Sequence, residues 1–121
     1  MSVRVLIADD HRLFAEALRA MLSADERIEV VGLAESGDEA VTQADDLEPD
    51  VVLMDISMPG LNGLEATRKI IGTRPDARVL VLTGSDAQED VDAARTAGAA
   101  GYMTKDRIAA ELVVTILDVA A

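Results

Sequence analysis

Five short apolar runs, each followed by a stretch of helical periodicity, alternate along this chain of 121 residues. Runs that are so nearly continuous are typical of strands covered on both faces. Short connections between alternating strands and helices predict a parallel sheet wound on both faces, because crossovers are right-handed. The predicted fold class is therefore a doubly wound α/β domain. The predicted strands are Val3–Ala8, Ile28–Ala34, Val51–Asp55, Arg78–Thr83 and Gly101–Met103.

Helical periodicity and its start and stop signals predict five helices after these strands. Between Leu13 and Leu22, two rows of apolar residues spaced by four form one stripe that we expect to be buried. Ser36 and Glu39 match a capping box at the start of the second helix. Ser85 or Asp86 is expected to cap the fourth helix, whose few large apolar side chains predict loose packing. The predicted helices cover residues 11–23, 36–47, 64–72, 85–97 and 108–119.

The composition excludes several classes of protein. With 23 acidic and 11 basic residues the net charge is -12, which argues against a direct hold on nucleic acid or an anionic membrane. The absence of cysteine excludes disulfides and thiolate metal sites. No apolar run approaches membrane-spanning length, and the first residues do not resemble a signal peptide. We therefore expect one cytoplasmic domain with no membrane partner, for which a cation or a basic protein is the favoured partner.

Polar side chains stand where several predicted strands end. Asp9 and Asp10 follow the first strand, Asp55 ends the third, Thr83 ends the fourth, and Lys105 follows the fifth. Turn signals after position 55 make the chain leave the sheet there. Because the carboxyl ends of parallel strands meet at one edge, where such sheets bind ligands, we expect these five side chains to gather.

The predicted cluster has the chemistry of a phosphoryl-transfer site. Neighbouring carboxylates repel each other unless a cation joins them, and their hard oxygen atoms suit Mg²⁺. A carboxylate can attack phosphorus to give an acyl phosphate, a reaction that needs positioning and neutralisation of the phosphoryl oxygens. Lys105 can neutralise them, and the hydroxyl of Thr83 can donate to one of them. Movement of Thr83 toward that oxygen is a candidate first step of a switch.

Four segments of the chain resemble motifs of the receiver domain of two-component response regulators. Their positions at the ends of the first, third, fourth and fifth strands make the resemblance specific, and it covers essentially the whole chain. It implies a flavodoxin-like (βα)5 fold with strand order 2-1-3-4-5. The start of the first motif and Lys105-Asp106 further resemble the NarL/FixJ subfamily, also called LuxR-type. The segments are Asp9–Phe14, Asp55–Gly63, Thr83-Gly84 and Gly101–Lys105.

The resemblance also implies the roles of the metal-binding residues. Asp55 would accept a phosphoryl group from a sensor histidine kinase in the presence of Mg²⁺, with Mn²⁺ as an alternative. Asp10, Asp55 and the backbone carbonyl of Ser57 would be direct ligands, and Asp9 would act through water. The domain would catalyse only its own phosphorylation and dephosphorylation, so it would be a regulatory domain and not an enzyme in the ordinary sense.

Thr83 and Tyr102 match the switch residues of the family. On phosphorylation Tyr102 would follow the Thr83 hydroxyl inward and change the surface formed by the fourth helix, the fifth strand and the last helix. This surface would control an output, which is transcription in the subfamily, and homodimerisation is one route to it. We expect a C-terminal helix-turn-helix domain in the full-length regulator, absent from residues 1–121, to make any DNA contact. A stand-alone receiver is the alternative.

Many receivers have proline after the motif lysine, whereas Asp106 stands there in this chain. His11 is expected to face solvent at the start of the first helix. It is not expected to bind zinc, because no second ligand follows at metal-site spacing.

Three rival functions are weighed against the receiver hypothesis. A flavodoxin-like electron carrier should have a neutral or glycine-rich phosphate loop after the first strand, where this chain has two carboxylates. A phosphatase acting through an aspartyl phosphate needs a second acid two residues after the nucleophile, where Ser57 stands. A pseudo-receiver that acts only as an interaction module would have lost the site residues, and they are all present.

Overall fold

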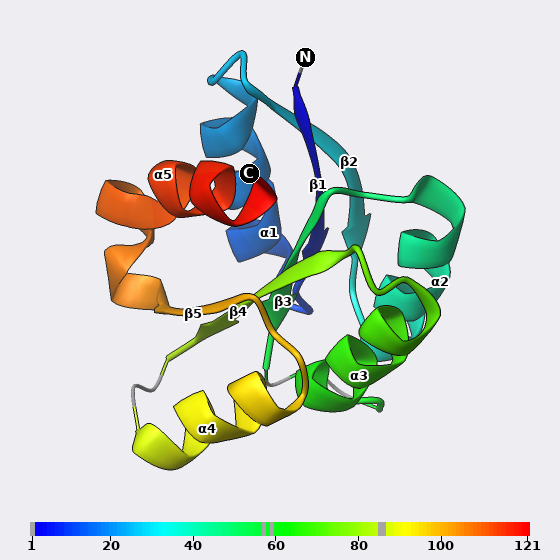
Figure 1. The fold of residues 1–121 in the computed structure, drawn as a ribbon. Helices are drawn as coiled ribbons and strands as arrows, with labels where there is room; N and C mark the ends of the chain where they lie inside the picture. The colour runs from blue at the N-terminus through cyan, green and yellow to red at the C-terminus, as the bar shows by residue number, and fades with distance from the viewer. Residues whose placement is uncertain (1, 57, 59, 85–86) are drawn as a thin grey trace.

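A five-stranded parallel sheet forms the centre of the structure, a computed structural model that describes residues 2–56, 58, 60–84 and 87–121 (Figure 1). Its strand order is β2-β1-β3-β4-β5, which confirms the predicted flavodoxin-like topology. Every strand pair is parallel, so all carboxyl ends point to the same edge. The strands are β1 (Val3–Ala8), β2 (Ile28–Ala34), β3 (Val51–Asp55), β4 (Arg78–Thr83) and β5 (Gly101–Thr104).

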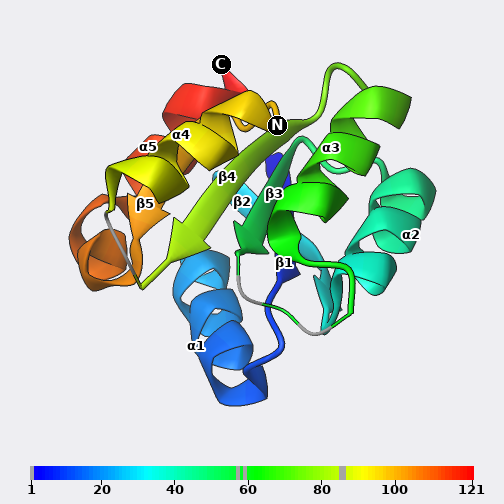
Figure 2. The same ribbon diagram turned by 90° about the horizontal axis from the view of Figure 1, so that it is seen from below.

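Helices cover both faces of the sheet, as a nearly continuous apolar strand pattern requires. Helices α1 and α5 pack on one face, and α2, α3 and α4 pack on the other (Figures 1 and 2). Alternate side chains of each strand enter the two cores, so that Val5 and Ile7 lie in one and Leu6 and Ala8 in the other. The helices are α1 (Arg12–Ser23), α2 (Gly37–Leu47), α3 (Gly63–Thr73), α4 (Gln88–Thr96) and α5 (Ile108–Ala120).

Side-chain caps define where two of the helices begin. The hydroxyl of Ser36 accepts the backbone N–H of Glu39 at 3.1 Å, which confirms the predicted cap of α2. The Glu39 carboxylate in turn accepts the N–H of Glu35 at 3.1 Å, one residue before the N-cap. At α3 the Asn62 side chain accepts the N–H groups of Leu64 and Glu65, each at 3.0 Å. The sequence patterns did not predict this second cap, because Asn62-Gly63 is also a turn signal.

The buried face of α1 is narrower than the predicted stripe. Ala15, Leu18 and Leu22 are buried, whereas Ala17 is exposed and Leu13 is 85% exposed. The prediction was wrong for Leu13 and Ala17, which fall on the margin of the apolar stripe, whereas Met21 of the same row is partly buried and packs against the core. Leu13 is consequently a solvent-facing neighbour of the site.

Helix α4 is the least anchored of the helices, as expected. It has nine residues, and Ala94 is its single buried residue. Ala87 occupies the N-cap without a side-chain hydrogen bond, and the predicted capping residues Ser85 and Asp86 lie outside the described residues. At the other end Gly98 adopts a φ of 100°, which confirms it as the C-terminal stop.

Gly63 allows α3 to begin directly against the end of β3. A Cβ atom at this position would collide with the backbone of Asp55 and Ile56. The N–H of Gly63 donates to the carbonyl of Ile56 at 3.3 Å, which closes the loop between strand and helix. Glycine is therefore required here by close approach of two backbone segments.

After β5 the chain enters a short 3-10 helix, η1 (Lys105–Arg107), that leads straight into α5. The peptide bonds of the described residues are all trans, including the one between Lys105 and Asp106. Within the described ranges, none of the helices combines the length and the apolar character that crossing a membrane requires.

Candidate functional site

Two buried carboxylates lie side by side at the carboxyl edge of the sheet. Asp9 follows the last residue of β1 and is 2% exposed, and Asp55 is the last residue of β3 and is 3% exposed. The parallel register pairs Ala8 with Met54, which brings the two acids to the same level. The backbone N–H of His11 donates to Asp9 Oδ1 at 2.8 Å and fixes that side chain. The structure thus brings together two of the predicted site residues, Asp9 and Asp55.

Lys105 extends over this pair from the far side of β4. Its Nζ atom lies 3.3 Å from Asp9 Oδ2 and 3.8 Å from Asp55 Oδ1. The lysine side chain is 27% exposed, so its charge is only partly screened by water. The same ammonium lies 4.4 Å from the centroid of the Phe14 ring, at the beginning of α1. Sequence patterns did not predict this aromatic contact.

Asp10 and His11 complete a compact group of possible ligands. One ligand atom from each of Asp9, Asp10, His11 and Asp55 lies within 4.8 Å of the others. His11 is exposed, as predicted, and its Nδ1 atom is 3.3 Å from Asp9 Oδ1 and 3.5 Å from Asp10 Oδ1. The sequence shows no second ligand for His11 at metal-site spacing, yet the connection after β1 brings its imidazole close to the carboxylates in space.

The donor atoms of this group fit a hard divalent cation. Carboxylate oxygens from two strand ends face one small volume, and Mg²⁺ typically takes one or two carboxylates and completes its shell with water and phosphate oxygens. Asp10 is exposed, so the group is open to solvent and to an incoming ligand. The predicted carbonyl ligand, Ser57, lies outside the described residues.

Thr83 and Tyr102 occupy neighbouring strands next to the carboxylates. Thr83 ends β4 one residue beyond Leu82, which is the register partner of Asp55, and it is 3% exposed. Tyr102 is half-buried in β5 and pairs with Val81. Thr83 therefore lies at the strand end that the sequence predicted, and Tyr102 lies one strand further along the sheet, at the second residue of β5.

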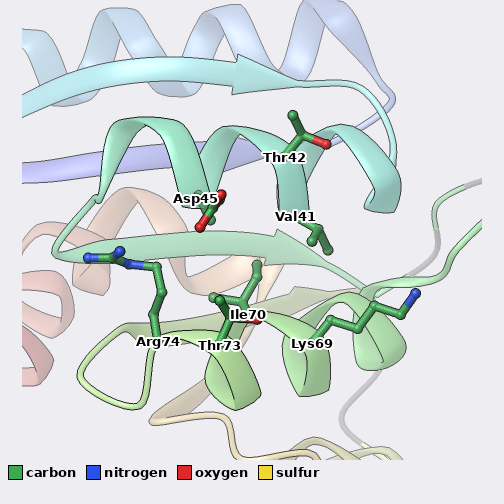
Figure 3. A pocket seen from close by; sticks show the side chains of 8 residues that line it. Val41, Thr42, Asp45, Lys69, Ile70, Thr73 and Arg74 are labelled. Carbon is green, nitrogen blue, oxygen red and sulfur yellow. The ribbon is translucent and has the colours of Figure 1, made fainter.

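A separate groove of about 290 Å³ runs between α2 and α3. Figure 3 shows Lys69 at one end and Arg74 at the other, with Val41 and Ile70 between them. Arg74 is already paired with Glu48 at 3.0 Å. The groove contains none of the predicted site residues and has no paired carboxylates, so the acidic group at the sheet edge is the better candidate for chemistry.

Comparison with known proteins agrees with this geometry. Residues 5–117 match the family described as the response regulator receiver domain. The chain is 46% identical over 114 residues to the response regulator GacA of Pseudomonas viridiflava, covering 94% of this chain and 53% of GacA. It is 41% identical over 118 residues to the transcriptional regulatory protein DegU of Brevibacillus brevis, covering 98% and 50%. The chain thus spans about half the length of the curated relatives it matches.

Solved structures give the same result for the fold. The signal receiver domain of the response regulator NarL from Mycobacterium tuberculosis superposes with a TM-score of 0.94 at 36% identity, covering 98% of this chain and 96% of that one. A LuxR-family response regulator from Aurantimonas also gives a TM-score of 0.94, at 34% identity, with 99% and 86% covered. Both the predicted family and the predicted NarL/LuxR-type relationship are confirmed.

Proposed function

The chain belongs to the response regulator receiver domain family, and we propose that Asp55 accepts a phosphoryl group from a sensor histidine kinase. The observation that carries this proposal is the meeting of Asp9, Asp55 and Lys105 at one sheet edge, with separations of 3.3 and 3.8 Å from the ammonium to the two acids. A buried carboxylate next to a cation is a nucleophile held in place for reaction with phosphorus.

The proposed step transfers one phosphoryl group. An oxygen atom of Asp55 forms a bond to phosphorus while the bond from phosphorus to the histidine nitrogen of the kinase breaks. The nitrogen keeps the electron pair of that bond, and the product on this chain is an acyl phosphate. Attack by water on the same phosphorus later releases inorganic phosphate and restores the Asp55 carboxylate. The domain in this proposal promotes only these two reactions of its own side chain.

Residues around Asp55 prepare it for the incoming charge. Mg²⁺, or Mn²⁺ in its place, would be held by Asp10, Asp55 and the Ser57 carbonyl, with Asp9 acting through water, and would neutralise phosphoryl oxygens. Lys105 would contribute a second positive charge, because its ammonium lies next to both Asp9 and Asp55. Such preorganised charges are usually the largest contribution to phosphoryl transfer.

Thr83 and Tyr102 would convert the modification into a change of surface. The Thr83 hydroxyl would donate to a phosphoryl oxygen, and Tyr102 would move inward beside α4. The changed surface would comprise α4, β5 and α5. Since curated relatives such as DegU are transcriptional regulators, we propose that it controls transcription in the cytoplasm through a C-terminal helix-turn-helix domain. Phosphorylation would favour a homodimer, and only the additional domain would contact DNA.

Intact-mass measurement after incubation with Mg²⁺ and acetyl phosphate tests the proposal directly. We expect the mass of one phosphoryl group, removed by hydroxylamine and absent when EDTA replaces Mg²⁺. Asp55→Ala should abolish the adduct, whereas Asp46→Ala, which removes an exposed acid on α2, should retain it. A wild-type protein that acquires no adduct would indicate a pseudo-receiver. An adduct that survives Asp55→Ala and is not traced to Asp9 or Asp10 would contradict the assignment.

A further inference from the structure

Among the described residues, the ring of Phe14 is a neutral partner of the Lys105 ammonium. The Nζ atom lies 4.4 Å from the ring centroid, inside the range of a cation–π contact. Its other partners are the carboxylates of Asp9 and Asp55. The ammonium thus lies between two acids and an aromatic face.

Phe14 has a fixed position because its helix is anchored. It is half-buried and packs against the core that contains Ala15, Leu18 and Leu22 of α1. Lys105, in contrast, has a long side chain at the first residue of a short 3-10 helix and remains 27% exposed. A flexible lysine side chain loses much conformational entropy when it is held in one place, so a rigid partner matters for its position.

A ring holds an ammonium in a different way from a carboxylate. A carboxylate cancels the positive charge and occupies an N–H donor, whereas a ring face attracts the cation through its quadrupole. The ring therefore adds a contact to the ammonium without adding to the negative charge that Asp9 and Asp55 already bring, and without occupying a further N–H donor. Such a contact suits a lysine that is to meet incoming phosphoryl oxygens.

We infer that Phe14 is a positioning residue for Lys105, whose ammonium its ring face holds beside Asp9 and Asp55. The inference rests on the proposed function for its kinetic consequence, because the positioned ammonium is the charge that meets the phosphoryl group. The contact can be measured in protein that has been given neither metal nor a phosphoryl donor. It can therefore be tested whether or not the chain accepts phosphate.

The contact has a spectroscopic signature that core packing alone would not produce. Protons next to the Lys105 ammonium lie over the ring, so their resonances should be shifted upfield by its ring current. The chain has two lysines, Lys69 and Lys105, so protein with isotope-labelled lysine contains its own reference signal. We expect the shift for Lys105 and not for Lys69 in metal-free wild-type protein.

Two substitutions separate the effect of the aromatic ring at position 14 from the effect of side-chain volume. Phe14→Leu keeps an apolar side chain and removes the ring, and Phe14→Tyr keeps the ring. The upfield shift should disappear in the first variant and persist in the second. With Mg²⁺ and acetyl phosphate, Phe14→Leu should slow phosphorylation by about threefold to tenfold, and Phe14→Tyr should restore it to near the wild-type rate. Leu13→Ala, on the exposed neighbour, is the matched control and should change neither quantity.

Each remaining outcome overturns the inference. Lys105 resonances that are the same in Phe14→Leu and wild type would show that the ring does not hold the ammonium. If Phe14→Leu loses the upfield shift but is phosphorylated at the wild-type rate, the contact does not position Lys105 for reaction. The same conclusion would follow if Phe14→Tyr keeps the shift but is phosphorylated as slowly as Phe14→Leu. Failure of the wild type to be phosphorylated at all would overturn the proposed function instead, and the ring-current measurement would still decide whether Phe14 holds Lys105.

Discussion

Lys105 and Asp9 form a hydrogen bond of 3.3 Å although they are 96 positions apart in the sequence. The contact joins the connection after β1 to the first residue of η1, across the two intervening strands β3 and β4. It is partly buried, so removal of either partner leaves a charge that water screens incompletely. Lys105 therefore links two distant parts of the chain and is also, beside the proposed metal ion, the second cation of the site.

Replacement of this lysine tests its chemical role. Lys105→Met should slow phosphorylation by acetyl phosphate on the order of 10²-fold, because a preorganised charge facing the phosphoryl group is lost. Mg²⁺ binding, measured by calorimetry, should persist because the carboxylates remain. Lys69→Met, on the exposed side of α3, is the control and should leave both measurements unchanged. A Lys105→Met variant that is phosphorylated at the wild-type rate would exclude the proposed role.

Asp55→Asn should stabilise the metal-free fold at neutral pH while abolishing phosphorylation. Asp9, Asp10 and Asp55 lie within one small volume, and Lys105 offsets only part of their mutual repulsion. We expect a gain in the free energy of unfolding of about 1 kcal/mol in EDTA, and a larger stabilisation by Mg²⁺ for the wild type than for the variant. Denaturant titrations measure both. Equal stability in EDTA would mean that Lys105 and local hydrogen bonds already neutralise the cluster.

The switch should act on the side of the sheet where α4 packs. This helix has a single buried residue, Ala94, and a hollow of about 140 Å³ lies beside it, lined in part by Val91 and Tyr102. Sparse packing permits a second arrangement at low free-energy cost. Phosphorylation, or a stable phosphoryl analogue, should therefore change amide hydrogen exchange most between residues 85 and 102. Changes confined to α2 and α3 would refute this prediction.

A pH effect is expected far from the site, at the turn before β2. Hydrogen bonds from the Arg27 guanidinium, at 2.7 and 3.0 Å, lower the pKa of Asp25 from 3.8 to about 2. A carboxyl group with a lowered folded pKa stabilises the fold above its unfolded pKa, and this contribution is lost as the pH falls from about 3.8 toward 2. NMR titration should give a low pKa for Asp25 that returns toward 3.8 in Arg27→Ala. An unchanged value in the variant would contradict the assigned cause.

Much of the fold was predictable because its strands are buried on both faces. The boundaries of Ile28–Ala34 and Arg78–Thr83 agree with the sequence patterns at both ends, since apolar runs and turn residues coincide there. The gathering of Asp9, Asp55 and Lys105 followed from topology alone, because parallel strands end at one edge. The exposure of Leu13 was not predictable, since an apolar stripe does not show how much of the helix surface the neighbouring elements will cover.

The missed features of the site share a physical cause. The approach of His11 to the carboxylates depends on the short connection between β1 and α1, and the Phe14 contact depends on the conformation of a long lysine side chain. Neither has a period or a spacing that sequence patterns record. Side chains that meet across elements through local turns and rotamers require coordinates.

The close approach at Gly63 has a consequence for mutational scanning. Alanine at this position would push the end of β3 away and displace Asp55, although glycine contributes no functional group to the site. In a scan scored only by phosphoryl uptake, Gly63 would thus rank among the apparent catalytic positions. Measuring the folding of each variant as well would separate residues that take part in the chemistry from Gly63, which is required only because it has no side chain.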